Sequence, residues 1–256
     1  MSNPTRYVLV TGANGGIGKA ICEEFSANGY RVLATDCQPQ PITDLACSHY
    51  LPLDLQTFVQ DETVAERFLK EVKTLVKDGE LQALINNAAI QILGGVDSLT
   101  RHDWQTTLDI NLSAPFLLSQ GLVNELEAAK GSIVNISSIH AKLTKKNFVA
   151  YATSKAALSG MTRAMAVDLG PRVRVNAIEP AAIETEMLKA GFKDSLDFYK
   201  KLKNHHPTQT LGKTKEIGCL ALFLTAKNAK FIHGSCIDIS GGITSSLNDP
   251  KEFTLE

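Results

Sequence analysis

Residues 8–18 read VLVTGANGGIG, an apolar run that passes directly into a glycine-rich turn and then into a helical pattern. Glycine tolerates backbone conformations and close contacts that other residues do not. We expect Gly12 to form the tight turn, Gly16 to let a pyrophosphate approach and Gly18 to allow close helix packing. The spacing fits TGxxxGxG, and with Gly15 as the middle glycine it also fits GxxGxxG. The dinucleotide contacts predicted in this turn are Gly12, Asn14, Gly15, Gly16, Ile17 and Gly18.

The same strand-to-helix alternation continues along the chain on both sides of this turn. Short apolar runs predict strands at residues 7–10, 32–34, 50–53, 83–85, 132–136, 173–178 and 236–239. Helical patterns cover residues 17–28, 57–77, 101–126, 151–169 and 215–224. Strands that alternate with helices form right-handed crossovers. We therefore predict one α/β domain over residues 1–256, a doubly wound parallel β-sheet flanked by helices, of the Rossmann type.

Residues 184–212 break this alternation, because they are polar and lysine-rich and carry no strand signal. The segment follows a strand that ends near Ile178, and open α/β sheets bind ligands at the carboxyl ends of their strands. We expect it to be a substrate lid, with a plain surface loop as the alternative. Its pair His205-His206 is expected to be exposed, because no carboxylate or cysteine stands at metal-ligand spacing.

The composition excludes several classes of protein. The 256 residues carry a net charge of −1, so no basic surface for nucleic acid is expected. No apolar stretch is long enough to span a membrane, and no signal-peptide pattern opens the chain. Five widely spaced cysteines, an odd count, indicate reduced thiols rather than disulfides or a metal site. We expect a cytoplasmic protein without a bound metal.

Asp36 ends the second predicted strand, 18 residues after Gly18. An acidic residue at about this interval hydrogen-bonds the adenosine ribose of a dinucleotide. The same carboxylate repels a 2′-phosphate, which at ~4 Å and an effective dielectric of ~20 costs about 4 kcal/mol, roughly three decades of affinity. No basic residue follows Asp36, because Cys37-Gln38-Pro39 come next. We predict NAD(H) rather than NADP(H).

Two Tyr–Lys pairs occur at helical i, i+4 spacing, Tyr151–Lys155 and Tyr199–Lys203. Only the first is preceded by a serine that ends a strand, since Ser138 closes the run that begins at residue 132. Tyr199 lies in the irregular polar segment, where we expect an ordinary surface position. Tyr151 is therefore the candidate for proton transfer.

The chemistry of a carbonyl and a nicotinamide explains this set of residues. A free tyrosine has a pKa of about 10, and a neighbouring ammonium stabilises the phenolate and lowers that value. Lys155 would supply this charge, helped by the nicotinamide ring, and would also donate to the nicotinamide ribose. Ser138 would hydrogen-bond the substrate oxygen. Asn111 could hold a water that links Lys155 to solvent.

Together these motifs resemble the short-chain dehydrogenase/reductase family over nearly the whole chain. The matching segments are residues 11–18, Asp54-Leu55, Asn86-Asn87-Ala88-Ala89, Asn111, Ser137-Ser138, Tyr151 with Lys155, residues 176–180 and residues 234–242. The resemblance implies an oxidoreductase, commonly a tetramer, of the single-domain branch with the TGxxxGxG turn. It also implies these further cofactor contacts: Asp54 and Leu55 at adenine, Asn87, Ala88 and Ala89 along the groove, and Pro180, Ile183 and Thr185 beside the nicotinamide.

The chain departs from the family pattern at two positions. Ala89 stands where the family usually has glycine, and so does Ala181, which follows Pro180. If the position of Ala181 required a positive φ, alanine there would cost about a kcal/mol or reshape the loop.

The substrate is not named by the sequence. Residues expected to face it are Gln91, His140, Phe148, Glu179 and Ala181, with parts of residues 184–212. Gln91 and His140 resemble the positions that grip a carboxylate in D-3-hydroxybutyrate dehydrogenases, but Phe148 replaces the lysine of that clamp, with Lys145 and Lys146 nearby. A small hydroxy acid, a sugar or polyol, a steroid and a cyclic ketone all stay open.

Two expectations concern partners and an alternative function. The helix at 215–224 is apolar around more of its surface than one buried stripe requires, and the strand at 236–239 should lie at a sheet edge. Two-fold contacts through such an edge would give a homotetramer. The alternative to an enzyme is a non-catalytic NAD(H)-sensing protein on the same fold, which would be expected to lack the Tyr–Lys pair or the serine.

Overall fold

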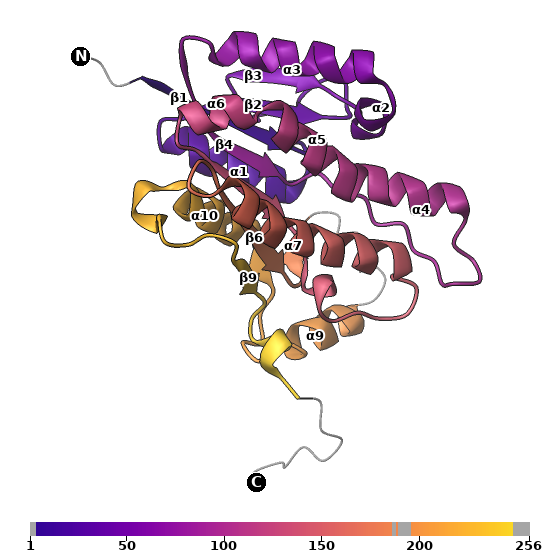
Figure 1. Cartoon of the computed structure of the whole chain (residues 1–256). Coiled ribbons are helices and arrows are strands. Elements are labelled where there is room, and N and C mark those ends of the chain that lie inside the picture. Colours follow the sequence, from indigo (N-terminus) through magenta and orange to yellow (C-terminus); the bar gives the residue numbers. More distant parts are fainter. Residues whose placement is uncertain (1–3, 186–187, 189–195, 248–256) are drawn as a thin grey trace.

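The computed structural model describes residues 4–185, 188 and 196–247. Seven parallel strands form one sheet in the order β3-β2-β1-β4-β5-β6-β9 (Figure 1). The strands are β1 (Thr5–Thr11), β2 (Arg31–Asp36), β3 (His49–Pro52), β4 (Gly79–Asn86), β5 (Ser132–Ile136), β6 (Arg174–Pro180) and β9 (Cys236–Ile239). Each contains or overlaps one of the seven predicted runs. The predicted doubly wound parallel sheet is therefore confirmed.

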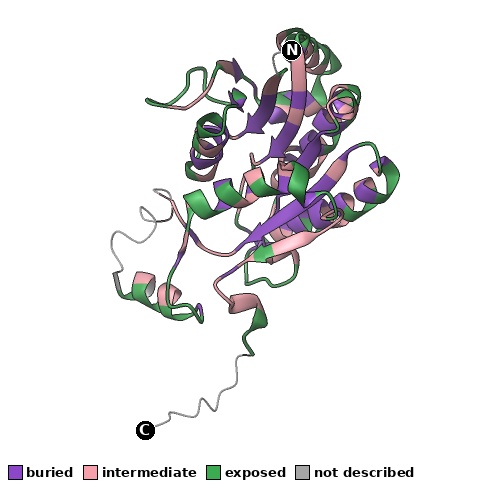
Figure 2. Ribbon diagram, turned by 90° about the vertical axis from the view of Figure 1, so that its left-hand side faces the viewer, coloured by how far each residue is buried: buried purple, intermediate pink, exposed green. Residues whose placement is uncertain are grey.

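Helices cover both faces of this sheet. They are α1 (Gly16–Ala27), α2 (Leu55–Gln60), α3 (Glu62–Val76), α4 (Arg101–Leu108), α5 (Ala114–Gly121), α6 (Val123–Ala128), α7 (Val149–Leu169), α9 (Leu196–Asn204) and α10 (Thr214–Thr225). α1 and α10 pack on one face, whereas α3, α5, α6 and α7 pack on the other. Figure 2 shows the strands buried between these layers, with exposed residues on the outer sides of the helices.

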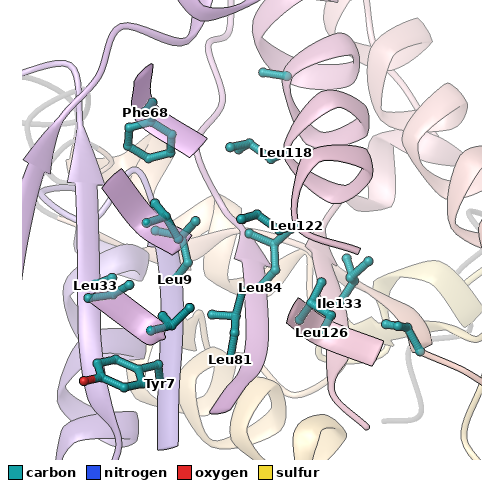
Figure 3. Packing of buried hydrophobic residues seen from close by; sticks show 14 of the residues in the cluster. Tyr7, Leu9, Leu33, Phe68, Leu81, Leu84, Leu118, Leu122, Leu126 and Ile133 are labelled. Carbon is teal, nitrogen blue, oxygen red and sulfur yellow. The ribbon is translucent and has the colours of Figure 1, made fainter. Parts of the chain in front are cut away.

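Successive side chains of a strand point to opposite faces of the sheet, and helices cover both faces, so both sets of side chains must be apolar. Leu9 joins the core under α3, α5, α6 and α7, whereas Val8 and Val10 join the core under α1 and α10. Figure 3 shows the first core, in which strand residues such as Leu84 and helix residues such as Leu118 fill one apolar layer. Full burial of each such leucine stabilises the fold by roughly 1.5–3 kcal/mol. This explains why the strands are continuous apolar runs.

Two long helices expected from the sequence are interrupted. The predicted helix at 57–77 divides at Asp61, whose carboxylate accepts hydrogen bonds from the N–H groups of Thr63 and Val64 and so begins α3. The predicted helix at 101–126 contains a π-helical turn over Asp109–Ser113 between α4 and α5, and it breaks again at Leu122. Hydrophobic periodicity follows the apolar face and does not register such local changes of hydrogen bonding.

The expectation that residues 184–212 lack strand structure is wrong at both ends of the segment. β7 (Ile183–Glu184) pairs with β8 (Gly212–Lys213) as a two-stranded parallel sheet, and α9 lies between them in the chain. Strands of two residues are too short to produce a sequence pattern. The expectation that His206 is exposed is also wrong. Its side chain is buried, and its Nδ1 lies 2.8 Å from the Leu202 carbonyl oxygen. The rest of the predicted lid, residues 186–187 and 189–195, lies outside the described residues.

The strand order reverses next to β1, which lies between β2 and β4. The chain leaves β1 toward β2 and later returns to β4 on the other side. Ligands of doubly wound sheets bind at the carboxyl ends of the strands at such a reversal. The loops after β1, β4 and β5 are therefore where a functional site is expected. None of the helices in the described part of the chain is long and apolar enough to cross a membrane.

Candidate active site

The glycine turn follows β1 at the reversal point, and two of its glycines are required by their surroundings. Gly12 has φ +64°, and a Cβ atom there would lie 2.8 Å from the Cα of Ala88. A Cβ atom on Gly18 would lie 2.0 Å from the carbonyl oxygen of Gly12. Both side chains would clash with backbone, which cannot move aside. The turn is thus packed closely against the loop after β4.

The N-terminus of α1 faces outward from this turn without a cap. Gly15 is its N-cap residue, no side chain in the described structure bonds to its first N–H groups, and the first turn carries no acidic residue. Gly15 and Gly16 are exposed and Ile17 is partly buried. Free N–H groups at the positive end of a helix dipole bind anions such as a pyrophosphate. These residues fit a dinucleotide.

Asp36 lies beside the glycine turn, as the sequence predicts. Its Oδ2 accepts a hydrogen bond from the Asn14 N–H at 3.0 Å. The Asn14 side chain is committed to protein partners, because its Nδ2 donates to Gln40 O and Tyr50 Oη, and its Oδ1 accepts from Ile42 N. Asn14 therefore joins Asp36 to the loop that contains Gln40 and Ile42. The Asp36 carboxylate keeps further acceptor positions for ribose hydroxyls.

Asp54 and Leu55 follow β3, on the far side of β2 from the glycine turn. The Asp54 carboxylate caps α2, with Oδ1 accepting from Gln56 N at 3.0 Å and Oδ2 from Thr57 Oγ1 at 2.9 Å. Leu55 is buried in the apolar core. In the structure both residues hold the loop after β3 in place. Their predicted contact with adenine stays a prediction.

The loop after β4 is tied to the glycine turn through Thr11, a residue that the sequence argument did not single out. The Thr11 hydroxyl accepts hydrogen bonds from the N–H groups of Asn87 and Ala88, each at 3.0 Å. Asn87 Nδ2 donates to the carbonyl oxygens of Thr11 and Gly12 at 2.9 and 3.0 Å. Ala89 is exposed. Asn87 and Ala88 are therefore held directly against the glycine turn at Gly12.

Tyr151, Lys155 and Ser138 meet where β5 ends and α7 begins. Ser138 follows β5 and is 6% exposed, and its hydroxyl interacts with the phenol of Tyr151. Lys155 is 2% exposed, one turn along α7, and its ammonium nitrogen lies 5.8 Å from the centre of the Tyr151 ring. Lys155 Nζ donates to the Ile136 carbonyl oxygen at 2.7 Å. The predicted trio is brought together.

The surroundings shift the ionisation of both side chains. Burial raises the pKa of the Tyr151 phenol, and its interaction with the Ser138 hydroxyl acts in the opposite direction. Burial lowers the pKa of the Lys155 ammonium to about 7. The expected net lowering of the Tyr151 pKa is not found in the protein alone, because desolvation outweighs the neighbouring groups. A buried phenol and a buried amine with displaced pKa values are typical of proton-transfer sites.

Asn111 is fully buried in the π-helical turn after α4. Its Oδ1 accepts from Ile90 N at 2.8 Å, and its Nδ2 donates to Ile90 O at 2.9 Å and to Ser154 Oγ at 3.0 Å. Both amide protons are therefore used. The side chain joins the loop after β4 to helix α7 between Tyr151 and Lys155, so Asn111 aligns the two walls of the site.

His140 and Phe148 form an aromatic wall with Tyr151. The His140 and Phe148 rings stack with centroids 4.6 Å apart, and the Tyr151 ring meets each of them edge-on at 5.7 and 6.0 Å. Burial and the charge of Lys145 lower the pKa of His140, which favours the neutral ring. Lys145 Nζ lies 4.6 Å from the centre of the Phe148 ring.

Gln91 belongs to the loop after β4 and is exposed. This loop meets the segment before α7 where Gly94 N–H donates to Asn147 O at 2.8 Å. The structure thus places the Gln91 loop beside the aromatic wall of His140 and Phe148. No hydrogen bond among the described residues joins Gln91 to His140, so their predicted joint grip on a carboxylate stays a prediction.

The loop after β6 holds the remaining predicted residues. Pro180 ends β6, and Ile183 is 7% exposed in β7. The Thr185 hydroxyl accepts from Leu188 N at 3.1 Å, and a Cβ atom on Gly16 would lie 3.1 Å from the Thr185 methyl. The predicted nicotinamide loop therefore reaches the glycine turn.

The two other residues expected near substrate in this loop behave differently. Ala181 does not have a positive φ, and its N–H donates to Ile239 O at 3.1 Å, so alanine is accommodated without strain. Glu179 was expected to face substrate, but its side chain is 0% exposed and paired within the protein. A carboxylate next to a family motif is easily taken for a ligand, because the sequence does not show which partner neutralises it.

The comparisons with known proteins agree with this arrangement. The family profile described as Enoyl-(Acyl carrier protein) reductase matches residues 12–244. Protein FixR of Bradyrhizobium diazoefficiens is 36% identical over 93% of this chain and 86% of its own length. The NAD-dependent glycerol dehydrogenase of Listeria innocua is 32% identical over 93% of this chain and 94% of its own. The human dehydrogenase/reductase SDR family member 4 is 31% identical over 94% of this chain and 88% of its own length.

Solved structures show the same fold over nearly the full chain. The ligand-free aldohexose dehydrogenase of Thermoplasma acidophilum superposes with a TM-score of 0.87 at 29% identity, covering 97% of this chain and 98% of its own. A 4-hydroxyisoleucine dehydrogenase complexed with NADH superposes with a TM-score of 0.84 at 29% identity, covering 95% of this chain and 100% of its own. The chain belongs to the short-chain dehydrogenase/reductase family and is an oxidoreductase of that family.

Proposed function

We propose that the chain is an NAD(H)-dependent oxidoreductase that interconverts a secondary alcohol and a ketone, with Tyr151 as the general acid/base. One observation carries this proposal. A buried lysine, a partly buried tyrosine and a strand-end serine converge at the carboxyl edge of the sheet, where the glycine turn that fits a dinucleotide also lies. A relative named as an NAD-dependent glycerol dehydrogenase and a structural neighbour complexed with NADH support it.

The residues around the glycine turn would hold the cofactor by distinct interactions. The free N–H groups at the start of α1 would bind the pyrophosphate, and Asp36 would accept the hydroxyls of the adenosine ribose. Asn87 and Ala88 would line the groove, and Ile183 and Thr185 would close it beside the nicotinamide. When bound there, the cofactor supplies or accepts the hydride.

The chain itself moves the proton. In ketone reduction the Tyr151 phenol donates its proton to the substrate oxygen, and in alcohol oxidation the phenolate accepts it. Ser138 hydrogen-bonds the same oxygen and stabilises charge that develops on it. Positive charge near the phenol, from Lys155 and from the oxidised nicotinamide ring, would act with Ser138 against the desolvation that raises the Tyr151 pKa.

The substrate side of the proposed site begins with an aromatic wall. His140 and the buried Phe148 place a stacked pair of rings beside Tyr151. We propose that residues 184–212 close over it as a lid within one domain that spans residues 1–256. A neutral His140 and the apolar stack favour an uncharged alcohol or ketone over a carboxylate, with Gln91 at the outer rim.

A spectrophotometric screen tests this function. Secondary alcohols and ketones are offered with NAD(H) and with NADP(H), and absorbance of the reduced nicotinamide is followed. The kcat/KM should favour NAD(H) by about three decades, and Asp36→Ala should narrow that ratio. Equal use of both cofactors by the wild type would contradict the assignment of Asp36. NADH binding without turnover of any substrate would favour the NAD(H)-sensing alternative.

Two apolar surfaces support a homotetramer. β9 lies at the edge of the sheet, and Phe223 of the adjacent helix α10 is 44% exposed. On the opposite side of the sheet, α5 and α7 form an apolar hollow of about 540 Å³ lined by Leu112, Ser113, Phe116, Leu117, Ala157 and Met161. Two distinct two-fold contacts generate a D₂ tetramer. Light scattering should give about four times the 27.7 kDa of one chain, and a mass near 27.7 kDa would refute the assembly.

A further inference from the structure

The carboxylate of Glu179 is fully buried at the carboxyl end of β6 and contacts two elements of the active site. Its Oε1 accepts a hydrogen bond from the Ser159 hydroxyl at 2.7 Å. Its Oε2 lies 2.7 Å from the ammonium nitrogen of Lys142. Ser159 belongs to helix α7, and Lys142 directly follows the short 3₁₀ turn Ile139–Ala141, whose N-cap residue is Ser138.

Lys142 ties the turn after Ser138 to two strands at once. Its Nζ also lies 3.1 Å from Oδ1 of Asp238 in β9. Glu179 and Asp238 are register partners in neighbouring parallel strands, so both carboxylates reach the same ammonium. This sharing raises the pKa of Lys142 and lowers that of Asp238. Cys236 and Arg163 also lie nearby, with Arg163 Nη1 3.6 Å from Cys236 Sγ, and burial together with Glu179 raises the pKa of Cys236.

Ser159 ties the same carboxylate to the catalytic helix. It lies one turn beyond Lys155 on α7, and its hydroxyl is 2.8 Å from the hydroxyl of Ser137. Ser137 in turn donates to the carbonyl oxygen of Lys155 at 3.0 Å and immediately precedes Ser138. The network therefore reaches the residue before Ser138 and the backbone of Lys155.

A buried carboxylate holds its partners firmly, because an unpaired charge in the protein interior is very unfavourable. Lys142 is 49% exposed, so its contacts with Glu179 and Asp238 fix a side chain that would otherwise move in solvent. We propose that Glu179 is a positioning residue that, through Lys142 and Ser159, sets the contact between the Ser138 hydroxyl and the Tyr151 phenol. This inference rests on the proposed function.

Three variants and one control separate positioning from simple stabilisation. Glu179→Gln removes the charge with little change of shape, Lys142→Met removes the partially exposed ammonium, and Lys142→Arg restores a cation. The control is Lys73→Met, because Lys73 is 41% exposed and pairs with Glu125 at 3.8 Å, away from the site. Folding of each variant is checked by circular dichroism and by NADH affinity. If Glu179→Gln does not fold, Lys142→Met tests the same network in its place.

The first measurement is a double-mutant cycle with Ser138→Ala. Glu179→Gln and Lys142→Met should each lower kcat roughly 10–100-fold, the scale of a small misplacement in an active site. Each should also move the acid limb of the kcat–pH profile upward, because the Ser138 contact lowers the Tyr151 pKa. Neither should add to the loss in Ser138→Ala, and Lys142→Arg should recover most activity. Losses that add to that of Ser138→Ala would overturn the proposal.

The second measurement does not depend on activity. The His140 N–H donates to the Ser138 hydroxyl at 3.1 Å, so its hydrogen exchange reports the order of this turn. Exchange should be faster in Glu179→Gln and Lys142→Met and unchanged in Lys73→Met. Unchanged exchange in the first two variants would overturn the proposal. If the wild type turned over no substrate, the proposed function would fail, and exchange at His140 would still decide the role of Glu179.

Discussion

The chain contains two Tyr–Lys pairs of identical spacing in very different surroundings. In both, the lysine follows the tyrosine by one helical turn, and the ammonium nitrogen lies near the ring, at 5.8 Å for Lys155 over Tyr151 and 5.0 Å for Lys203 over Tyr199. Helix geometry alone therefore produces the pair. It does not produce the site.

The surroundings separate the two pairs. Lys155 is almost completely buried and donates to the end of β5, whereas Lys203 is only partly buried on α9. Burial raises the pKa of the Tyr151 phenol, and its interaction with the Ser138 hydroxyl opposes that rise. The Tyr199 phenol donates to the Glu184 carboxylate, and this hydrogen bond raises the pKa of Tyr199 above its ordinary value. A serine favours the phenolate and a carboxylate opposes it. The two pairs therefore differ in what surrounds them and not in their spacing, and under the proposed function the strand end beside the helix decides which pair transfers a proton.

The largest difference is expected when each lysine is removed. Lys155→Met should lower kcat by about 10³-fold, because the cation that stabilises the phenolate is lost. Lys203→Met should stay within about twofold of the wild type. Steady-state kinetics with the substrate found by the screen measures both. Similar losses in the two variants would break the distinction between the pairs.

A smaller effect is expected from Ser138→Ala. Loss of one donor to the reacting oxygen lowers kcat by about 10²-fold in comparable sites. The acid limb of the kcat–pH profile should also move upward, because the Ser138 contact that lowers the Tyr151 pKa is gone. NADH affinity, measured by fluorescence, should be retained. An unchanged pH profile would show that Ser138 does not act on the phenol.

The smallest effect concerns stability and follows from the pKa of Lys155. Folding lowers that pKa from an ordinary 10.5 to about 7, so between these values the unfolded chain holds one more proton. Stability should therefore rise with pH in this window by about 1.4 kcal/mol per pH unit from this group. Urea unfolding at pH 7.5 and 9.5 should show this slope reduced in Lys155→Met and retained in Lys203→Met. An equal slope in the wild type and Lys155→Met would contradict the burial of the lysine.

The fold was largely predictable because buried parallel strands are continuous apolar runs. All seven such runs became strands of one sheet, and the glycine turn lies at its reversal point. Local hydrogen bonding was not predictable in the same way. Asp61 divides a helix by capping, and Asn111 sits in a π-helical turn, yet neither changes the apolar period.

The site was predictable to the extent that its residues stand at motif spacing. Tyr151, Lys155 and Ser138 meet as expected, but the roles of Thr11 and Glu179 depend on partners far away in the chain. Their contacts with Ala88 and Lys142 arise only from strand order, which brings separate loops together. A sequence read one segment at a time does not carry that information.

The most direct test of the account compares the two tyrosines themselves. Tyr151→Phe and Tyr199→Phe each remove one hydroxyl from chemically similar pairs, and kcat is measured with NAD(H) and the best substrate. We expect a loss of at least ~10²-fold for Tyr151→Phe with NADH binding intact, and near-wild-type activity for Tyr199→Phe. An active Tyr151→Phe beside an inactive Tyr199→Phe would contradict the assignment of Tyr151 as the general acid/base.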